Sequence, residues 1–182
     1  MAIFRSLPFF TFILSCSTSV LLLSAAAAAG TTDLATQICK NTTNYAFCRD
    51  VIFSDPHAAG ADRDFLAYLI FRQAYLNATG TRDYIQSELK ENESGRSSDT
   101  FSGLRKCLGY YKMAVQRLAE MLGDRDSDTF SGLDKLSLDV EGSARACRAS
   151  VGTRWAGLTK RNEDLIKLSN MCLVVSKLYP YT

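Results

Sequence analysis

Residues 99–122 read DTFSGLRKCLGYYKMAVQRLAEML, and this stretch decides the fold class. Its apolar and aromatic side chains recur at steps of three and four residues, at Phe101, Leu104, Leu108, Tyr111, Val115, Leu118 and Leu122. Such steps draw one apolar stripe along an α-helix. We therefore predict a helix over 99–122, with Asp99 as its N-cap and Gly123 as its C-terminal stop. Gly103 and Gly109 each cost about 1 kcal/mol inside such a helix, and we interpret them as candidate points of close packing.

Three further segments show the same periodicity. Their stripes are Leu66, Ile70, Ala74 and Ile85 within 62–90; Leu133, Leu136, Val140, Ala144, Cys147 and Val151 within 129–151; and Leu165, Leu168, Cys172, Val175 and Tyr179 within 159–179. No proline falls within 57–179, so long helices are permitted there. The NATGT sequence at 77–81 predicts a kink or a break in the first of the three segments.

These four amphipathic segments are joined by short polar links at 92–98, 123–128 and 152–157. Segments of this length with short links predict an all-α, up-down-up-down four-helix bundle over 61–182. At 47% hydrophobic and 22% charged residues, the chain has enough apolar material for a core. Its formal net charge of +2 argues against a polybasic nucleic-acid binder.

Residues 1–29 have the three parts of a secretory signal peptide. Arg5 supplies the positive start, FFTFILSCSTSVLLL at 9–23 is the apolar part, and 25–29 is a run of alanines with small-residue cleavage sites. The competing interpretation is a transmembrane anchor, but the polar residues within 9–23 and the short length count against it. We predict secretion, and therefore conditions in which disulfides form.

The cysteine positions test the predicted bundle. The midpoint between Cys107 and Cys147 falls in the 123–128 link, so two helices folded back at that link bring these sulfurs together. The midpoint between Cys39 and Cys48 falls in NTTN at 41–44, a good turn sequence. We predict that Cys39 pairs with Cys48 to close a short N-terminal helical hairpin within 30–60, and that Cys107 pairs with Cys147. Cys172 is then left as a buried free thiol.

Three N-x-[ST] sequons are candidates for N-linked glycans in a secreted chain, at Asn41, Asn77 and Asn92. The heptapeptide SDTFSGL occurs twice, at 98–104 and 128–134, and each copy begins a predicted helix. We interpret the repeat as a reused helix start rather than as an internal duplication.

Motifs that would support catalysis are absent from the sequence. There is no CxxC, HExxH, GxSxG, P-loop or GxGxxG, and the single histidine, His57, lies in a loop-like stretch. The alternating aspartates Asp124, Asp126 and Asp128 resemble the start of a calcium loop, but the central Gly and the closing Glu are missing. We predict no catalytic residue, no metal and no cofactor, which leaves a binding protein.

The motifs that remain are C-K-N-T-T-N-Y-A-F-C at 39–48, L-R-K-C-L-G-Y-Y at 104–111, A-C-R at 146–148 and R-N-E-D-L-I-K-L-S-N-M-C-L-V-V-S-K-L at 161–178. In this order they resemble the plant invertase and pectin methylesterase inhibitor family over nearly all of 30–182. The family's C-x-x-T element corresponds to Cys39 and Thr42, and its C-x-x-x-Y signature to Cys107 and Tyr111. The resemblance implies a four-helix bundle with an N-terminal hairpin, in which the four matched cysteines pair first to second and third to fourth.

The resemblance also implies a function. Such a protein is not an enzyme but a non-covalent inhibitor that forms a 1:1 complex with a plant pectin methylesterase or acid invertase. It implies location in the apoplast or cell wall, or in the vacuole. Invertase inhibitors often carry Pro-Lys-Phe in the link between the second and third bundle helices, whereas GDRDSDTF at 123–130 lacks the proline. The C-terminal helix, by contrast, is nearer to the invertase-inhibitor-like group that includes pollen proteins, so the target stays open between the two enzymes.

Contact with the target enzyme is predicted for exposed polar residues and one aromatic residue. They are Arg125, Asp126, Asp128 and Phe130 in the 123–130 link, and Lys112, Gln116 and Glu120 on the preceding helix. The alternative for Phe130 is that it packs on the helix ends. Two other functions are open from sequence: a bundle that carries a small apolar ligand in its core, and a non-inhibitory extracellular signalling module.

Overall fold

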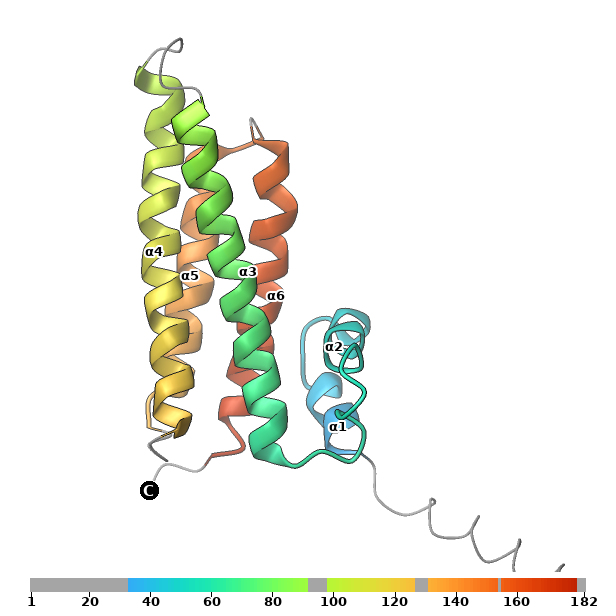
Figure 1. Cartoon of the computed structure of the whole chain (residues 1–182). Coiled ribbons are helices and arrows are strands. Elements are labelled where there is room, and N and C mark those ends of the chain that lie inside the picture. The colour runs from blue at the N-terminus through green and yellow to red at the C-terminus, as the bar shows by residue number, and fades with distance from the viewer. Residues whose placement is uncertain (1–32, 92–97, 127–130, 154, 180–182) are drawn as a thin grey trace, which may run out of the picture. The chain divides into compact units, whose positions relative to one another are not determined.

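The computed structural model describes residues 33–91, 98–126, 131–153 and 155–179. These residues form six helices and no strand. The helices are α1 (Leu34–Lys40), α2 (Tyr45–Ile52), α3 (Arg63–Glu91), α4 (Ser98–Asp126), α5 (Leu133–Val151) and α6 (Ala156–Ser176) (Figure 1). The predicted signal peptide, and the predicted site residues Asn92, Asp128 and Phe130, lie outside the described residues.

The four long helices α3 to α6 form an up-down-up-down bundle, as the sequence predicts (Figure 1). Each packs against its two neighbours in ring order, α3 on α4, α4 on α5, α5 on α6 and α6 on α3. The largest fully buried side chains of the bundle are Leu66, Ile70, Phe71, Ile85, Leu104, Tyr111, Leu118, Met121, Leu133 and Leu158. Every residue of the stripes predicted within 129–151 and 159–179 is buried, and Tyr179 lies just beyond the end of α6.

The buried face of α4 differs from the predicted stripe at alternate positions. Cys107, Ala114 and Met121 are fully buried, whereas Leu108, Val115 and Leu122 only flank the core. Both sets lie on one side of the helix, because residues one apart differ by only about a quarter turn. The packing of the neighbouring helices decides which of the two sets is fully buried.

The predicted ends of α4 are wrong at both termini. The helix begins at Ser98, so Asp99 lies in its first turn, and it continues through Gly123 to Asp126. One glycine costs only about 1 kcal/mol, which the packing of Leu118 and Met121 offsets. Arg125 and Asp126 therefore belong to the last turn of α4 and not to a link.

No break occurs at 77–81, where α3 runs without interruption. Ala74, Ala78, Thr81 and Ile85 are buried along one face. The Thr81 hydroxyl donates to the carbonyl oxygen of Asn77 at 2.8 Å, so the polar group is satisfied within the helix. Tertiary packing of this face overrides the weak helix preference of NATGT.

Two disulfides form as the spacing predicts. Cys39 and Cys48 join α1 to α2 with their Cα atoms 5.4 Å apart, and Cys107 and Cys147 join α4 to α5 with their Cα atoms 4.3 Å apart. Cys172 is a buried free thiol on α6, and burial raises its pKa. Because a thiol that stays protonated is a poor nucleophile, Cys172 acts as a core residue.

The hairpin of α1 and α2 packs on the α3–α6 side of the bundle. Its turn is held by Asn170, whose side-chain oxygen accepts from the backbone nitrogen of Thr43 at 2.8 Å and from its hydroxyl at 3.2 Å. Lys167 also lies 5.0 Å from the ring centre of Phe47. These contacts supplement the apolar packing of Ile38 and Ile52, which are buried in the same core as the bundle.

The glycine of the SDTFSGL repeat has a different environment in each copy. In the first copy Gly103 lies inside α4, where an added Cβ would overlap the carbonyl oxygen of Ser150 and lie 3.1 Å from its carbonyl carbon. In the second copy Gly132 has a φ of +81° and precedes α5 as its N-cap. The same seven residues therefore need glycine for close packing in one place and for a left-handed backbone in the other.

Replacing Gly103 with alanine is expected to destabilise the fold by about 1–3 kcal/mol, because the new methyl group meets a backbone carbonyl that cannot turn away. Gly109→Ala is the matched control on the same helix. Nothing lies within 4 Å of its added Cβ, so it should stabilise by up to about 1 kcal/mol. Urea unfolding of both variants measures the difference, and shifts of equal sign would contradict the close approach.

Candidate functional site

An open groove runs between α4 and α5 on the bundle surface, and we call it the α4–α5 groove. Its volume is about 380 Å³, and its lining residues are Tyr110, Met113, Arg117, Leu138, Asp139, Gly142, Ser143 and Ala146. The Met113 side chain is 50% exposed and that of Leu138 is 52% exposed. Two large apolar side chains thus face solvent from adjacent helices and line the same groove.

An ion pair crosses this groove. The Arg117 Nε atom lies 3.6 Å from Asp139 Oδ2 of α5, and Arg117 Nη1 donates to Glu120 Oε2 at 3.1 Å. All three side chains are partly exposed, so the pairs add little to stability. They do place the guanidinium of Arg117 in the groove that Met113 and Leu138 also line.

The predicted contact residues of α4 lie next to this groove. Lys112, Gln116 and Glu120 are exposed and spaced by four residues, so they form a polar row along one face of the helix. Lys112 and Gln116 directly precede the groove residues Met113 and Arg117 in the chain. Of the link residues, Arg125 and Asp126 lie on α4 itself, while Asp128 and Phe130 fall outside the described residues.

Sequence reasoning missed Met113 and Leu138. The sequence feature that could have indicated them is that both are apolar residues outside the predicted stripes of their helices. Such leftover apolar positions are ordinary when single, and only the packing of α4 against α5 brings these two to one groove.

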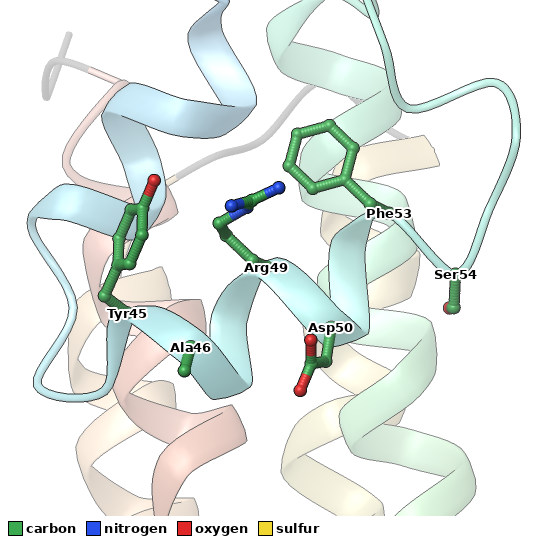
Figure 2. A pocket seen from close by; sticks show the side chains of 6 residues that line it. All are labelled: Tyr45, Ala46, Arg49, Asp50, Phe53 and Ser54. Carbon is green, nitrogen blue, oxygen red and sulfur yellow. The ribbon is translucent and has the colours of Figure 1, made fainter.

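A second exposed surface lies on α2, and Figure 2 shows its side chains. Tyr45, Arg49 and Phe53 follow at intervals of four, and the guanidinium carbon of Arg49 lies 5.9 Å from the Tyr45 ring centre and 5.6 Å from that of Phe53. With Ala46, Asp50 and Ser54 they border an open pocket of about 470 Å³. Because α2 packs on α3 and α6, this surface and the α4–α5 groove belong to different sides of the bundle.

The C-x-x-x-Y signature has a structural role in the core. Cys107 and Tyr111 lie one turn apart on the buried face of α4, and the Tyr111 hydroxyl donates to the side-chain oxygen of Asn162 on α6 at 2.8 Å. Burial raises the pKa of Tyr111, so the phenol stays neutral. The signature therefore links α4 covalently to α5 and by a hydrogen bond to α6.

Neither a metal-binding cluster nor a membrane-spanning helix is found in the described part of the chain. No three or more His, Cys, Asp or Glu side chains gather there as ligands for a metal ion. Within 33–91, 98–126, 131–153 and 155–179, no helix is long and apolar enough to cross a lipid bilayer.

The described residues thus form a disulfide-linked helical bundle with an exposed, partly apolar groove. The family model "Plant invertase/pectin methylesterase inhibitor" matches residues 33–175, and the chain belongs to this family. Members of the family are inhibitors and not enzymes, in agreement with the absence of a catalytic motif from the sequence.

Individual relatives agree with the family. A "Cell wall / vacuolar inhibitor of fructosidase 2" from Arabidopsis thaliana is 32% identical over 100 residues, which is 54% of this chain and 53% of the length of that relative. The chain thus matches about half of the relative's length. Two crystal structures of pectin methylesterase inhibitors from Arabidopsis, one of them a mutant form, each show 21% identity. The mutant form has a TM-score of 0.71 and the other 0.62; the matches cover 83% of this chain and 100% and 99% of those chains. At that identity they confirm the fold.

Proposed function

We propose that this chain is a secreted, non-covalent inhibitor that binds an acid invertase, a fructosidase, in a 1:1 complex through the α4–α5 groove. Family membership supports inhibition, and a fructosidase inhibitor is 32% identical to this chain over 100 residues. Pectin methylesterase is the other target that the family contains, and it is the second arm of the test.

The observation that carries this proposal is the pair of exposed apolar side chains, Met113 and Leu138, that line one groove with the ion-paired Arg117. Methionine and arginine are enriched at protein interfaces, and a buried centre with a polar rim is the usual plan of such a surface. Met113 and Leu138 provide the centre, while Lys112, Gln116 and Glu120 provide part of the rim. The groove sits on two helices joined by the Cys107–Cys147 disulfide, so little order is lost when a partner binds.

Replacing Leu138 with aspartate is expected to weaken inhibition by about 30-fold, which corresponds to about 2 kcal/mol at an interface centre. A buried carboxylate at that point would lose its hydration without a partner. The measurement is the inhibition constant of purified wild type and variant against a plant acid invertase and, in parallel, a pectin methylesterase.

Leu76→Asp is the matched control, because Leu76 is 47% exposed on α3 and does not line the groove. It should leave the inhibition constant unchanged. Equal losses for the two variants would contradict the groove as the contact surface, and wild-type protein that inhibits neither enzyme would overturn the proposed function. The carrier and signalling alternatives gain no specific observation from the described residues.

A further inference from the structure

Asn41 stands at the junction of α1 and the hairpin turn. It is the C-cap residue of α1, its side chain is exposed, and its Nδ2 donates one hydrogen to the carbonyl oxygen of Gln37 at 3.0 Å. Thr42 and Thr43 complete the sequon. The hydrogen bond sets the direction of the amide and leaves the second hydrogen of Nδ2 for substitution.

Asn77 has a different environment. It lies in the middle of α3, half-buried, with its side-chain oxygen buried and unpartnered among the described residues. The hydroxyl of Thr79, which belongs to the same sequon, is also buried. Both side-chain oxygens of this sequon are therefore enclosed by packing, and Asn77 is less accessible as an acceptor than the exposed Asn41.

Asn41 also forms part of a groove between α1 and α6, which we call the α1–α6 groove. Its volume is about 330 Å³, and the residues that line it with Asn41 are Leu34, Gln37, Ile38, Val174, Lys177 and Leu178. The walls are mainly apolar and come from the hairpin on one side and the bundle on the other. A group attached to Asn41 is already beside both walls, so its effective concentration at the groove is high.

We propose that Asn41 is an N-glycosylated residue of this chain, and that the first sugar of the glycan lies over the α1–α6 groove and braces the hairpin against α6. In the transfer, Nδ2 loses one hydrogen and forms a bond to C1 of an N-acetylglucosamine. That carbon leaves the diphosphate of a lipid-linked oligosaccharide, and the proton goes to a base. The inference rests on the secretion that is part of the proposed function.

Bracing has a physical basis at this place. The hairpin turn is held to α6 by the two hydrogen bonds from Thr43 to Asn170, which are exposed to water. A pyranose has an apolar face, and laid over Leu34, Val174 and Leu178 it removes apolar surface from water on both sides of the junction. The sugar therefore favours the attached hairpin.

The first experiment maps the modified residues. The full chain is produced in a eukaryotic secretory host, and N-linked glycans are released enzymatically in ¹⁸O-water, which labels each occupied asparagine. We expect label at Asn41 and none at Asn77. Secreted protein with an unlabelled Asn41 overturns the inference. A chain that carries no labelled sequon because it is not secreted overturns both the inference and the secretion, whereas the enzyme assays above test the inhibition separately.

The second experiment tests the bracing. Secreted protein trimmed to one sugar per site should melt at the same temperature as the fully glycosylated form, and Asn41→Gln should melt about 2–4 °C lower. Glutamine retains the side-chain amide. As the control, Asn41→Gln and wild type are both made in bacteria without glycan, and their melting temperatures should be equal. Equal melting temperatures for one-sugar and Asn41→Gln protein would overturn the bracing.

Discussion

Replacing both Cys107 and Cys147 with alanine is expected to lower the free energy of unfolding by about 4 kcal/mol. This disulfide closes a loop with a sequence separation of 40, and it ties α4 to α5 at two fully buried positions. Without it, the unfolded chain gains the freedom that the closed loop had removed. Urea unfolding of the double variant and of wild type gives the difference directly.

Removal of the other disulfide, by Cys39→Ala with Cys48→Ala, is the matched comparison. Its sequence separation is 9, for which the same entropy argument gives about 2.5 kcal/mol. The loss should also stay mainly in α1 and α2, because the hairpin packs on the bundle less extensively than the bundle helices pack on one another. A larger global loss from this pair than from Cys107 and Cys147 would contradict the account.

Replacing Tyr111 with alanine is expected to cost about 3–5 kcal/mol, since a fully buried aromatic side chain leaves a cavity. Tyr111→Phe separates the hydroxyl from the ring. It keeps the packing but leaves the buried side chain of Asn162 without its partner, at a cost of about 1–3 kcal/mol. Thermal and urea unfolding of both variants measures the two contributions.

The same variants bear on function. Tyr111 lies on the buried face of α4, away from the exposed groove residues Met113 and Arg117. Tyr111→Phe protein that is still folded should therefore inhibit its target as wild type does. A Tyr111→Phe variant as stable as wild type would show that Asn162 finds another partner and would contradict the assigned role of the signature.

Much of the fold could be predicted because it depends on period and spacing. The apolar stripes of α5 and α6 are those of the sequence, and the two disulfides follow from the positions of their cysteines between turn sequences. Two of the errors share a cause. Gly123 and the 77–81 segment have weak local preferences of about 1 kcal/mol, and packing along a long helix exceeds them.

The candidate site was harder to predict than the fold. The polar row of Lys112, Gln116 and Glu120 was predicted as exposed surface, since charged and amide side chains off the stripe face water. Met113 and Leu138 were missed, because their proximity depends on how α4 and α5 are rotated against each other. That rotation is a property of the packed pair and of neither helix alone.

The amino-acid sequence by itself determined that this protein is a helical bundle with two disulfides between cysteines near each other along the chain, because helical period and loop closure are local properties. The tertiary structure alone decided what identical local sequences become. One SDTFSGL copy begins α4 and packs its glycine against Ser150, while the other places Gly132 in a left-handed turn before α5. Packing differs between the two places, and neighbours that are distant in sequence supply the energy that selects each conformation.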